Sequence, residues 1–150
     1  MKRFVAPLVL GLLAAHEASA QTSPVPPVQW NAAPAAAQAQ LLQGGFARSG
    51  SDTAAVYTRK AGSVQEQLYI RTRGGQHWNV TYSAMGDSAS LQAKLDGVSA
   101  DQAQRSGPGM AEGAMRMWSI QGGERLAVPT HPSRLPDGAT FQFMIVYHRP

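Results

Sequence analysis

The sequence predicts an α+β domain in which an antiparallel sheet of about five to six strands carries one or two short helices. Three observations support this prediction. β-forming runs punctuated by glycine fill most of the chain after Phe46, Gly-Gly pairs separate such runs twice, and one intervening stretch changes to helical spacing. A β-sandwich is the alternative, because a second sheet can cover the first one as well as a helix can.

Residues 1–20 have the composition of a cleavable secretory signal peptide. Lys2 and Arg3 give a positive n-region, residues 4–15 form an apolar run, and residues 18–20 read Ala-Ser-Ala, a small-x-small cleavage pattern. The apolar run is shorter than the roughly 17 to 25 residues that cross a bilayer. We therefore expect export into a bacterial envelope, with a periplasmic or secreted product that keeps no transmembrane anchor after signal cleavage.

Residues 21–45 are rich in proline and alanine. The prolines that precede Pro34 favour extended, solvated backbone, so this part is expected to be a flexible leader. Pro34 itself can begin a short helix that runs through Leu42 and ends at the following Gly-Gly pair. The remaining residues, 46–150, form the predicted globular domain, which contains no cysteine and must be held by packing alone.

Six β-forming runs are expected to be strands. They are 54–60, 64–73, 78–84, 114–121, 125–128 and 139–148. The last run is apolar on both alternations, which predicts a central strand covered on both faces. Asp87 or Ser88 can cap a helix over 88–96. Gly97 is expected to end that helix, and a second short turn is expected over 99–104.

Two Gly-Gly pairs, at 74–75 and 122–123, each separate two β-forming runs and predict β-hairpins. A two-residue loop would pair Arg71 with Trp78 and Ile70 with Asn79, which places the apolar side chains of the two strands on opposite faces of the sheet. An odd, three-residue loop instead pairs Ile70 with Trp78 and joins the apolar residues on one face. We therefore predict odd loops in both hairpins.

Ligands for a metal or a catalytic centre are sparse. After the signal region the histidines are His77, His131 and His148, with no cysteine and no metal-binding spacing. The best-spaced carboxylates, Asp96 and Asp101, flank the expected end of a helix. A glycine-rich phosphate loop is absent as well. The sequence therefore predicts no metal site and no cofactor.

The Gly-Asp-Ser triplet at 86–88 resembles a block found in one class of serine esterases, with His131 or His148 downstream. That class places its serine after an early first strand of a larger α/β chain, whereas this triplet follows the third β-forming run. A helix cap accounts for Asp87 and Ser88 without any further requirement. The alternative hypothesis is a small extracytoplasmic hydrolase whose site assembles only in the fold.

One strand face has the composition of a binding surface. In the odd register, the polar side of the first hairpin carries Tyr69, Arg71, Arg73 and His77. Two arginines two positions apart project the same way, so they can clamp an anionic group while Tyr69 offers a stacking surface. A solvated strand face of the same composition is the competing interpretation.

The residues shortly before Trp118 include three methionines, Met110, Met115 and Met117. Methionine side chains adapt to irregular surroundings, so they can line a binding surface or fill a core. Filling an irregular core is the commoner use, and it is the interpretation preferred here.

The net charge is +4, and about +3 without the signal region, a mild excess that can favour anionic partners. Nucleic-acid binders usually show basic clustering on one face, and a signal peptide argues against such a partner, so no nucleic acid is expected to bind. We predict a non-enzymatic binding or accessory module that recognises a protein or an anionic polysaccharide, a class that includes inhibitor and immunity proteins. A pilin-like assembly subunit is a minor alternative, since the prolines of residues 21–34 make a poor donor strand.

Overall fold

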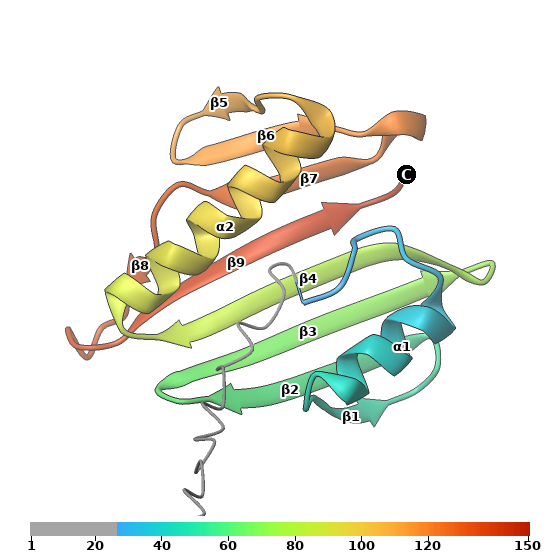
Figure 1. Ribbon diagram of the computed structural model, residues 1–150, viewed down its shortest axis with the longest axis horizontal. Coiled ribbons are helices and arrows are strands. Elements are labelled where there is room, and N and C mark those ends of the chain that lie inside the picture. The colour runs from blue at the N-terminus through green and yellow to red at the C-terminus, as the bar shows by residue number, and fades with distance from the viewer. Residues whose placement is uncertain (1–26) are drawn as a thin grey trace, which may run out of the picture.

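A computed structural model describes residues 27–150, which form one antiparallel sheet of nine strands with two helices (Figure 1). The α+β class is thus confirmed, and helices rather than a second sheet cover the apolar face. The strand count exceeds the five to six expected. Three of the strands are short and mostly exposed, so they produce no β-forming run that the sequence could reveal: β1 (Ala47–Gly50), β5 (Met110–Glu112) and β8 (Ser133–Arg134).

The sheet order is β1-β2-β3-β4-β9-β7-β6-β5, and β8 pairs with β9 beside this path. The longer strands are β2 (Ala54–Ala61), β3 (Val64–Arg73), β4 (Gln76–Gly86), β6 (Met115–Ser119), β7 (Arg125–Pro129) and β9 (Phe141–His148). The central place expected for the last strand is confirmed, because β9 lies between β4 and β7. Its expected coverage on both faces is wrong, since Met144 on the side away from the core is 55% exposed.

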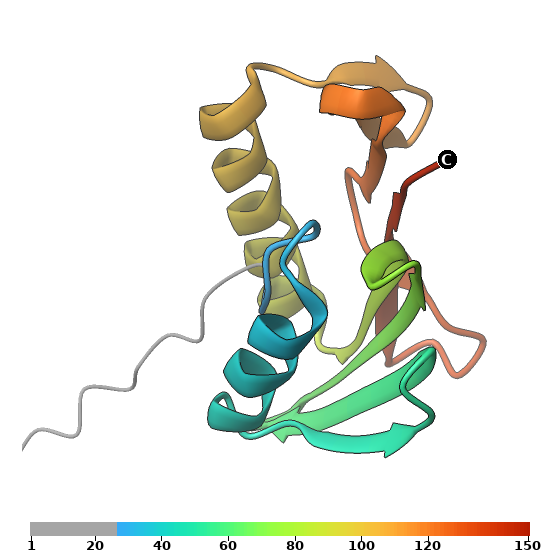
Figure 2. The same cartoon turned by 90° about the vertical axis from the view of Figure 1, so that its right-hand side faces the viewer.

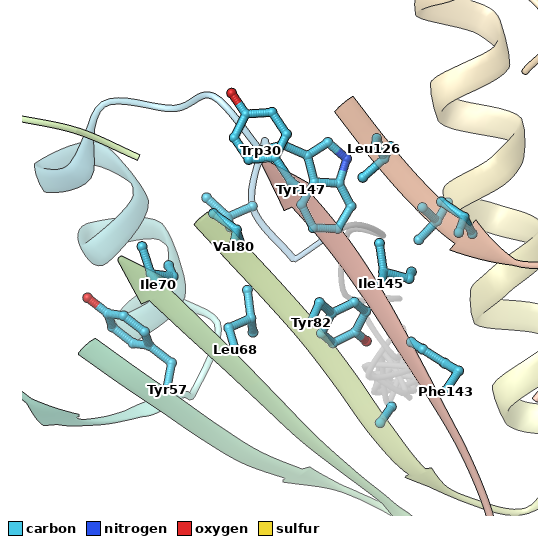
Figure 3. Packing of buried hydrophobic residues seen from close by; sticks show 14 of the residues in the cluster. Trp30, Tyr57, Leu68, Ile70, Val80, Tyr82, Leu126, Phe143, Ile145 and Tyr147 are labelled. Atoms are coloured by element: carbon cyan, nitrogen blue, oxygen red, sulfur yellow. The ribbon is translucent and has the colours of Figure 1, made fainter. Parts of the chain in front are cut away.

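Both helices lie on the same side of the sheet (Figure 2). Beneath them, apolar side chains from β3, β4 and β9 lie side by side on the inner face (Figure 3). These include Leu68, Ile70, Val80, Tyr82, Phe143, Ile145 and Tyr147. The other side of the sheet carries no helix, and we call it the outer face.

Helix α2 (Ser88–Ser106) is a single helix of 19 residues. Asp87 caps it by accepting a 2.8 Å hydrogen bond from the Ser90 amide, as one of the two capping options predicted. The predicted break at Gly97 is wrong, because the buried stripe that begins at Leu91 continues on both sides of that glycine to Gln102. Packing of that stripe outweighs the penalty of about 1 kcal/mol for glycine inside a helix.

Helix α1 (Pro34–Gln43) begins at a proline, as expected, and buries Ala37 and Leu41 against the sheet. Val28 and Trp30, within the segment expected to be flexible, are also buried. The packed region therefore begins before Phe46. The sequence did not reveal this, because the prolines near Val28 and Trp30 interrupt any periodic apolar pattern. The predicted signal peptide and residues 21–26 lie outside the described residues.

The first hairpin differs from the predicted register. Its loop contains two residues, Gly74 and Gly75, both with positive φ, and Arg73 pairs directly with Gln76. A β-bulge between this turn and the rest of the ladder leaves Trp78 without a partner, so Ile70 pairs with Val80 instead of Trp78. The apolar residues share one face, as predicted. In this hairpin a bulge after a two-residue loop places them there, and not the odd loop that was predicted.

The second hairpin has the predicted odd loop. Trp118 pairs with Leu126, and the Ile120 amide donates a 2.7 Å hydrogen bond to the Glu124 carbonyl, which closes a loop of three residues. In that loop Gly122 and Gly123 have positive φ, a conformation that favours glycine.

None of the helices within residues 27–150 is long and apolar enough to cross a membrane.

Candidate binding face

The outer face is basic where it crosses the middle of the sheet. Outward side chains on β2, β3, β4, β9 and β7 alternate with the buried ones. Lys60, Arg71, Arg73 and Arg125 are the charged side chains at these outward positions, and no aspartate or glutamate occurs among them. This face therefore presents positive charge with no neutralising carboxylate at the outward positions of these strands.

Two arginines and two aromatic rings on this face contact one another. The guanidinium carbon of Arg73 lies 4.6 Å from the ring centroid of Trp78, and that of Arg71 lies 5.8 Å from the same centroid. Arg71 also donates a 2.8 Å hydrogen bond from Nε to the Tyr69 hydroxyl. The edge of His148 meets the Trp78 ring at a centroid distance of 5.9 Å. We call these five residues the Arg-Trp cluster.

The bulge in the first hairpin builds this cluster. Regular alternation from Val80 would place the Trp78 side chain on the inner face. Because Trp78 is the unpaired residue of the bulge, its side chain points outward instead. Trp78 therefore lies against Arg71 and Arg73. The backbone of Trp78 is also held from the neighbouring chain segment, because the amide of Arg149, the residue after the end of β9, donates a 2.8 Å hydrogen bond to the Trp78 carbonyl.

Sheet register places a further arginine, Arg125, in the same transverse row of the outer face as Arg71. Arg71 pairs with Asn79, Asn79 with His148, and His148 with Arg125. Because neighbouring strands lie about 4.7 to 4.9 Å apart, this row spans roughly 14 Å from Arg71 to Arg125. Glu124, next to Arg125 in the sequence, is buried and accepts a 2.8 Å hydrogen bond from Arg149. The row thus has room for several anionic groups in line.

His77, which the sequence placed with the arginines, lies on the opposite side of the sheet. It is 2% exposed, and its Nδ1 is 3.4 Å from the Trp30 carbonyl oxygen. Burial lowers the pKa of His77 below its usual value, and the charge of Arg149 acts in the same direction. The ring lines a cavity of about 310 Å³ beside α1, together with Arg48 and Tyr57. His77 is therefore not part of the outer face.

The structure brings Tyr69, Arg71 and Arg73 together, and it adds Trp78, Arg125 and His148, which the sequence did not assign to this face. One signal for Trp78 was available. A two-residue Gly-Gly loop is compatible with apolar side chains on one shared face if a bulge follows the turn. Arg125 and His148 are neighbours only through the pairing of β7 with β9, which no local pattern reveals.

Ser88 occupies the first turn of α2 and is exposed. In residues 27–150 no hydrogen bond joins Ser88 to a histidine. The Nδ1 atom of His131 lies 3.2 Å from the side-chain oxygen of Gln92, and His148 packs against Trp78. The arrangement supports the helix-terminus interpretation of the Gly-Asp-Ser triplet.

Carboxylates and histidines do not gather around a metal position in the part of the chain that the structure describes. Asp96 accepts a 2.9 Å hydrogen bond from Gln92, and Asp101 forms an ion pair with Arg105. The two aspartates singled out by their spacing therefore serve separate contacts on the surface of α2.

Comparison of the chain with known protein families, with curated proteins and with solved structures finds no match. The class of protein is therefore inferred from the fold and the outer face alone.

Proposed function

We propose that this protein is an exported, non-enzymatic binding module that holds carboxylate groups of a protein or an anionic polysaccharide on the outer face of its sheet. The observation that carries this proposal is the contact of Arg73 and Arg71 with the Trp78 ring, on a face whose outward strand positions carry no carboxylate. Export is supported by the n-region, apolar run and cleavage pattern of residues 1–20.

Stacking prepares the arginines for an anion. A guanidinium that lies over an indole ring keeps its N–H edges free to donate two parallel hydrogen bonds to one carboxylate. Such charge-assisted, bidentate bonds are stronger than neutral ones. Because Trp78 restrains Arg73, less side-chain entropy is lost when a ligand arrives. The Arg-Trp cluster thus has the properties of a preorganised anion site.

The row from Arg71 to Arg125 favours a ligand with several carboxylates over a single small anion. A polyuronate chain and an acidic protein segment both present carboxylates in succession, and the roughly 14 Å between Arg71 and Arg125 leaves room for more than one of them. Two ligand sources thus share one recognition chemistry.

Titration of the purified chain with polygalacturonate, with poly-L-glutamate and with neutral dextran tests the proposal. We expect binding to at least one carboxylate polymer, no binding to dextran, and weaker binding at about 0.15 M salt than at low salt because exposed charges are screened. A preference between the two polymers identifies the ligand source.

Paired variants separate a defined site from bulk charge. Arg73→Gln and Lys60→Gln each remove one positive charge from the outer face, and only Arg73 stacks on Trp78. We expect Arg73→Gln to weaken binding about tenfold, the effect of losing one charge-assisted hydrogen bond, and Lys60→Gln to have little effect. Equal losses in the two variants, or no binding to either polymer, would overturn the proposal.

A further inference from the structure

Hollows on the two sides of the sheet differ in chemistry. The hollow on the outer face, of about 410 Å³, is lined by Met85, Met115 and Met144 and by no aspartate, glutamate, lysine or arginine. No methionine of residues 27–150 belongs to the core, so core filling, the interpretation preferred from the sequence, is wrong. The cavity beside α1 on the inner face is lined by one positive and one negative side chain, which restrict the ligand that it can hold.

Small residues beneath α1 leave room for this inner cavity. Gly50 on β1 pairs with Ala55 on β2, and Ala55 pairs with Ile70 on β3, so little side-chain volume fills this part of the sheet. Arg48 and Tyr57, paired with each other two positions along, form a taller wall. The rest of the lining consists of Pro34, Ala35, Gln38, Asp52, Thr72 and His77. A volume of about 310 Å³ lies at the lower end of the range for small-molecule sites.

An ion pair lies where this cavity meets solvent. Nη2 of Arg48 donates to Oδ1 of Asp52 at 2.6 Å and to the Ser51 carbonyl at 3.3 Å. The Asp52 backbone is held as well, because its carbonyl accepts a 3.1 Å hydrogen bond from the hydroxyl of Thr72. The side chains of Arg48 and Asp52 are 25% and 98% exposed. The cavity therefore presents a positive and a negative group side by side at its opening.

Both charged groups keep hydrogen-bonding capacity for a ligand. Arg48 uses Nη2 for its bonds to Asp52 and Ser51, whereas its Nε is buried without a partner. An unpaired buried N–H is unfavourable, so the guanidinium gains if it turns toward a new acceptor. An exposed ion pair contributes little to stability. Arg48 and Asp52 can therefore exchange each other for the charges of a ligand at little cost.

A ligand with a single charge would match one of these two groups and be repelled by the other. A zwitterion matches both, with its carboxylate against Arg48 and its ammonium against Asp52. The start of α1 favours the carboxylate further. Pro34 and Ala35 lie in the cavity wall, no side chain caps this helix terminus, and the positive end of the helix dipole is therefore directed at the cavity.

We propose that this cavity binds a free α-amino acid with an apolar side chain, which lies against Ala55 and Ile70 while Arg48 and Asp52 hold the two charged groups. Burial lowers the pKa of His77, so its ring is neutral near pH 7 and adds no third charge to the lining. The cavity and the Arg-Trp cluster lie on opposite sides of the sheet. The inference is therefore independent of the proposed function.

Titration of the nitrogen-15 labelled full chain with L-leucine, followed through the amide signals, tests the site. We expect a dissociation constant of about 1 mM or tighter, with shifts at Ala35, Asp52 and Thr72 and none on the distant edge strand β5. Two analogues each lack one charge of leucine: 3-methylbutylamine has no carboxylate and 4-methylpentanoate has no ammonium. Each analogue should bind at least about tenfold more weakly than leucine, because one of the two charged contacts is lost.

Variants of exposed residues separate this cavity from non-specific binding. Ala35→Leu places a larger side chain in the cavity wall and should weaken leucine binding at least about tenfold. Ala36→Leu, the same change at the neighbouring exposed residue outside the lining, should leave it unchanged. Asp52→Asn should weaken leucine binding about tenfold and narrow the difference from 4-methylpentanoate. Absence of shifts with leucine, an analogue that binds as tightly as leucine, or equal effects of Ala35→Leu and Ala36→Leu would overturn the proposal.

Discussion

Arg59 and Glu66 form an ion pair in the interior of the fold, with Arg59 Nε and Nη2 2.8 and 2.6 Å from Oε2 of Glu66. Glu66 has no exposed surface, and its second oxygen accepts hydrogen bonds from the Tyr82 hydroxyl at 2.6 Å and from Lys94 at 3.1 Å. Arg59 also donates to the Gly44 carbonyl at the end of α1. One carboxylate thereby connects β2, β3, β4 and α2, and through Arg59 it reaches α1.

Replacing Glu66 by Gln should lower the free energy of unfolding by about 3 to 5 kcal/mol, because Arg59 and Lys94 would keep their charges without the carboxylate that compensates them. Denaturant unfolding at neutral pH measures the change. Glu112→Gln on the exposed edge strand β5 is the matched control and should alter stability by no more than about 0.5 kcal/mol. Similar small effects of both substitutions would contradict a structural role for the buried pair.

The same carboxylate should make the fold sensitive to acid. Burial acts to raise the pKa of Glu66, but hydrogen bonds from Tyr82 and Arg59 and the charge of Lys94 outweigh it and leave that pKa below 4.5. A pKa lowered in the folded state contributes stability above the ordinary value and loses it as the pH falls through the lower one. The stability difference between the unmodified chain and Glu66→Gln should therefore shrink as the pH falls below 4.5. A difference that stays constant in this range would contradict the assignment.

His77 should add a second loss of stability at milder pH. Burial lowers its pKa, so the folded state favours the neutral ring while the unfolded chain takes up a proton near pH 6.5. The contribution is complete above pH 6.5 and is lost as the pH falls through the lower folded value. Melting temperatures of the unmodified chain, of His77→Gln and of the exposed control His131→Gln, compared on both sides of pH 6.5, test this expectation. The decline should be absent in His77→Gln alone.

The first hairpin shows how far alternation predicts a sheet. Period-two patterning placed Leu68 and Ile70 on the core side and Arg71 and Arg73 on the other, as the structure has them. The same pattern is satisfied by an odd loop or by an even loop with a bulge, so it cannot place Trp78. In its outward orientation the Trp78 ring contacts Arg73 and His148. Because His148 lies on a strand far along the chain, no local pattern reveals that contact.

Local patterns failed where packing against distant parts of the chain decides the outcome. A glycine at 97 resembles a helix end locally, but Leu95 and Val98 on either side of it are buried and keep the helix intact. The proximity of Met85 and Met144 is also invisible in the sequence, since they become diagonal neighbours only through the pairing of β4 with β9. Local patterns therefore predicted most strands and one face of β3, and they missed contacts that cross the sheet.

Gly109 allows the close approach of the chain to Trp118. A Cβ atom at this position would lie 2.6 Å from Cε2 of Trp118 and 2.7 Å from Cγ of Arg116. Trp118 is buried, and its Nε1 donates a 2.9 Å hydrogen bond to the Gly107 carbonyl, so the ring cannot move freely. We expect Gly109→Ala to destabilise the fold by about 1 to 3 kcal/mol through overpacking.

A double-mutant cycle separates this crowding from a backbone effect. In a Trp118→Leu background the indole is absent, so Gly109→Ala should cost less than it does in the unmodified chain. Denaturant unfolding of the four proteins gives the coupling energy. Purely additive effects would show that the indole does not determine the need for glycine at this position.

Leu41 and Leu42 are adjacent on α1 and test whether this helix belongs to the folded domain. Leu41 is fully buried in the core, and Leu42 is 47% exposed. If α1 is docked as the structure has it, Leu41→Ala should cost about 2 to 5 kcal/mol, the usual penalty for removing a buried leucine side chain. Leu42→Ala removes the same atoms from the exposed side and should change stability by no more than about 0.5 kcal/mol. Two small and equal effects would instead match the flexible leader that composition predicts, because a helix of 10 residues gains little stability in water without tertiary contacts.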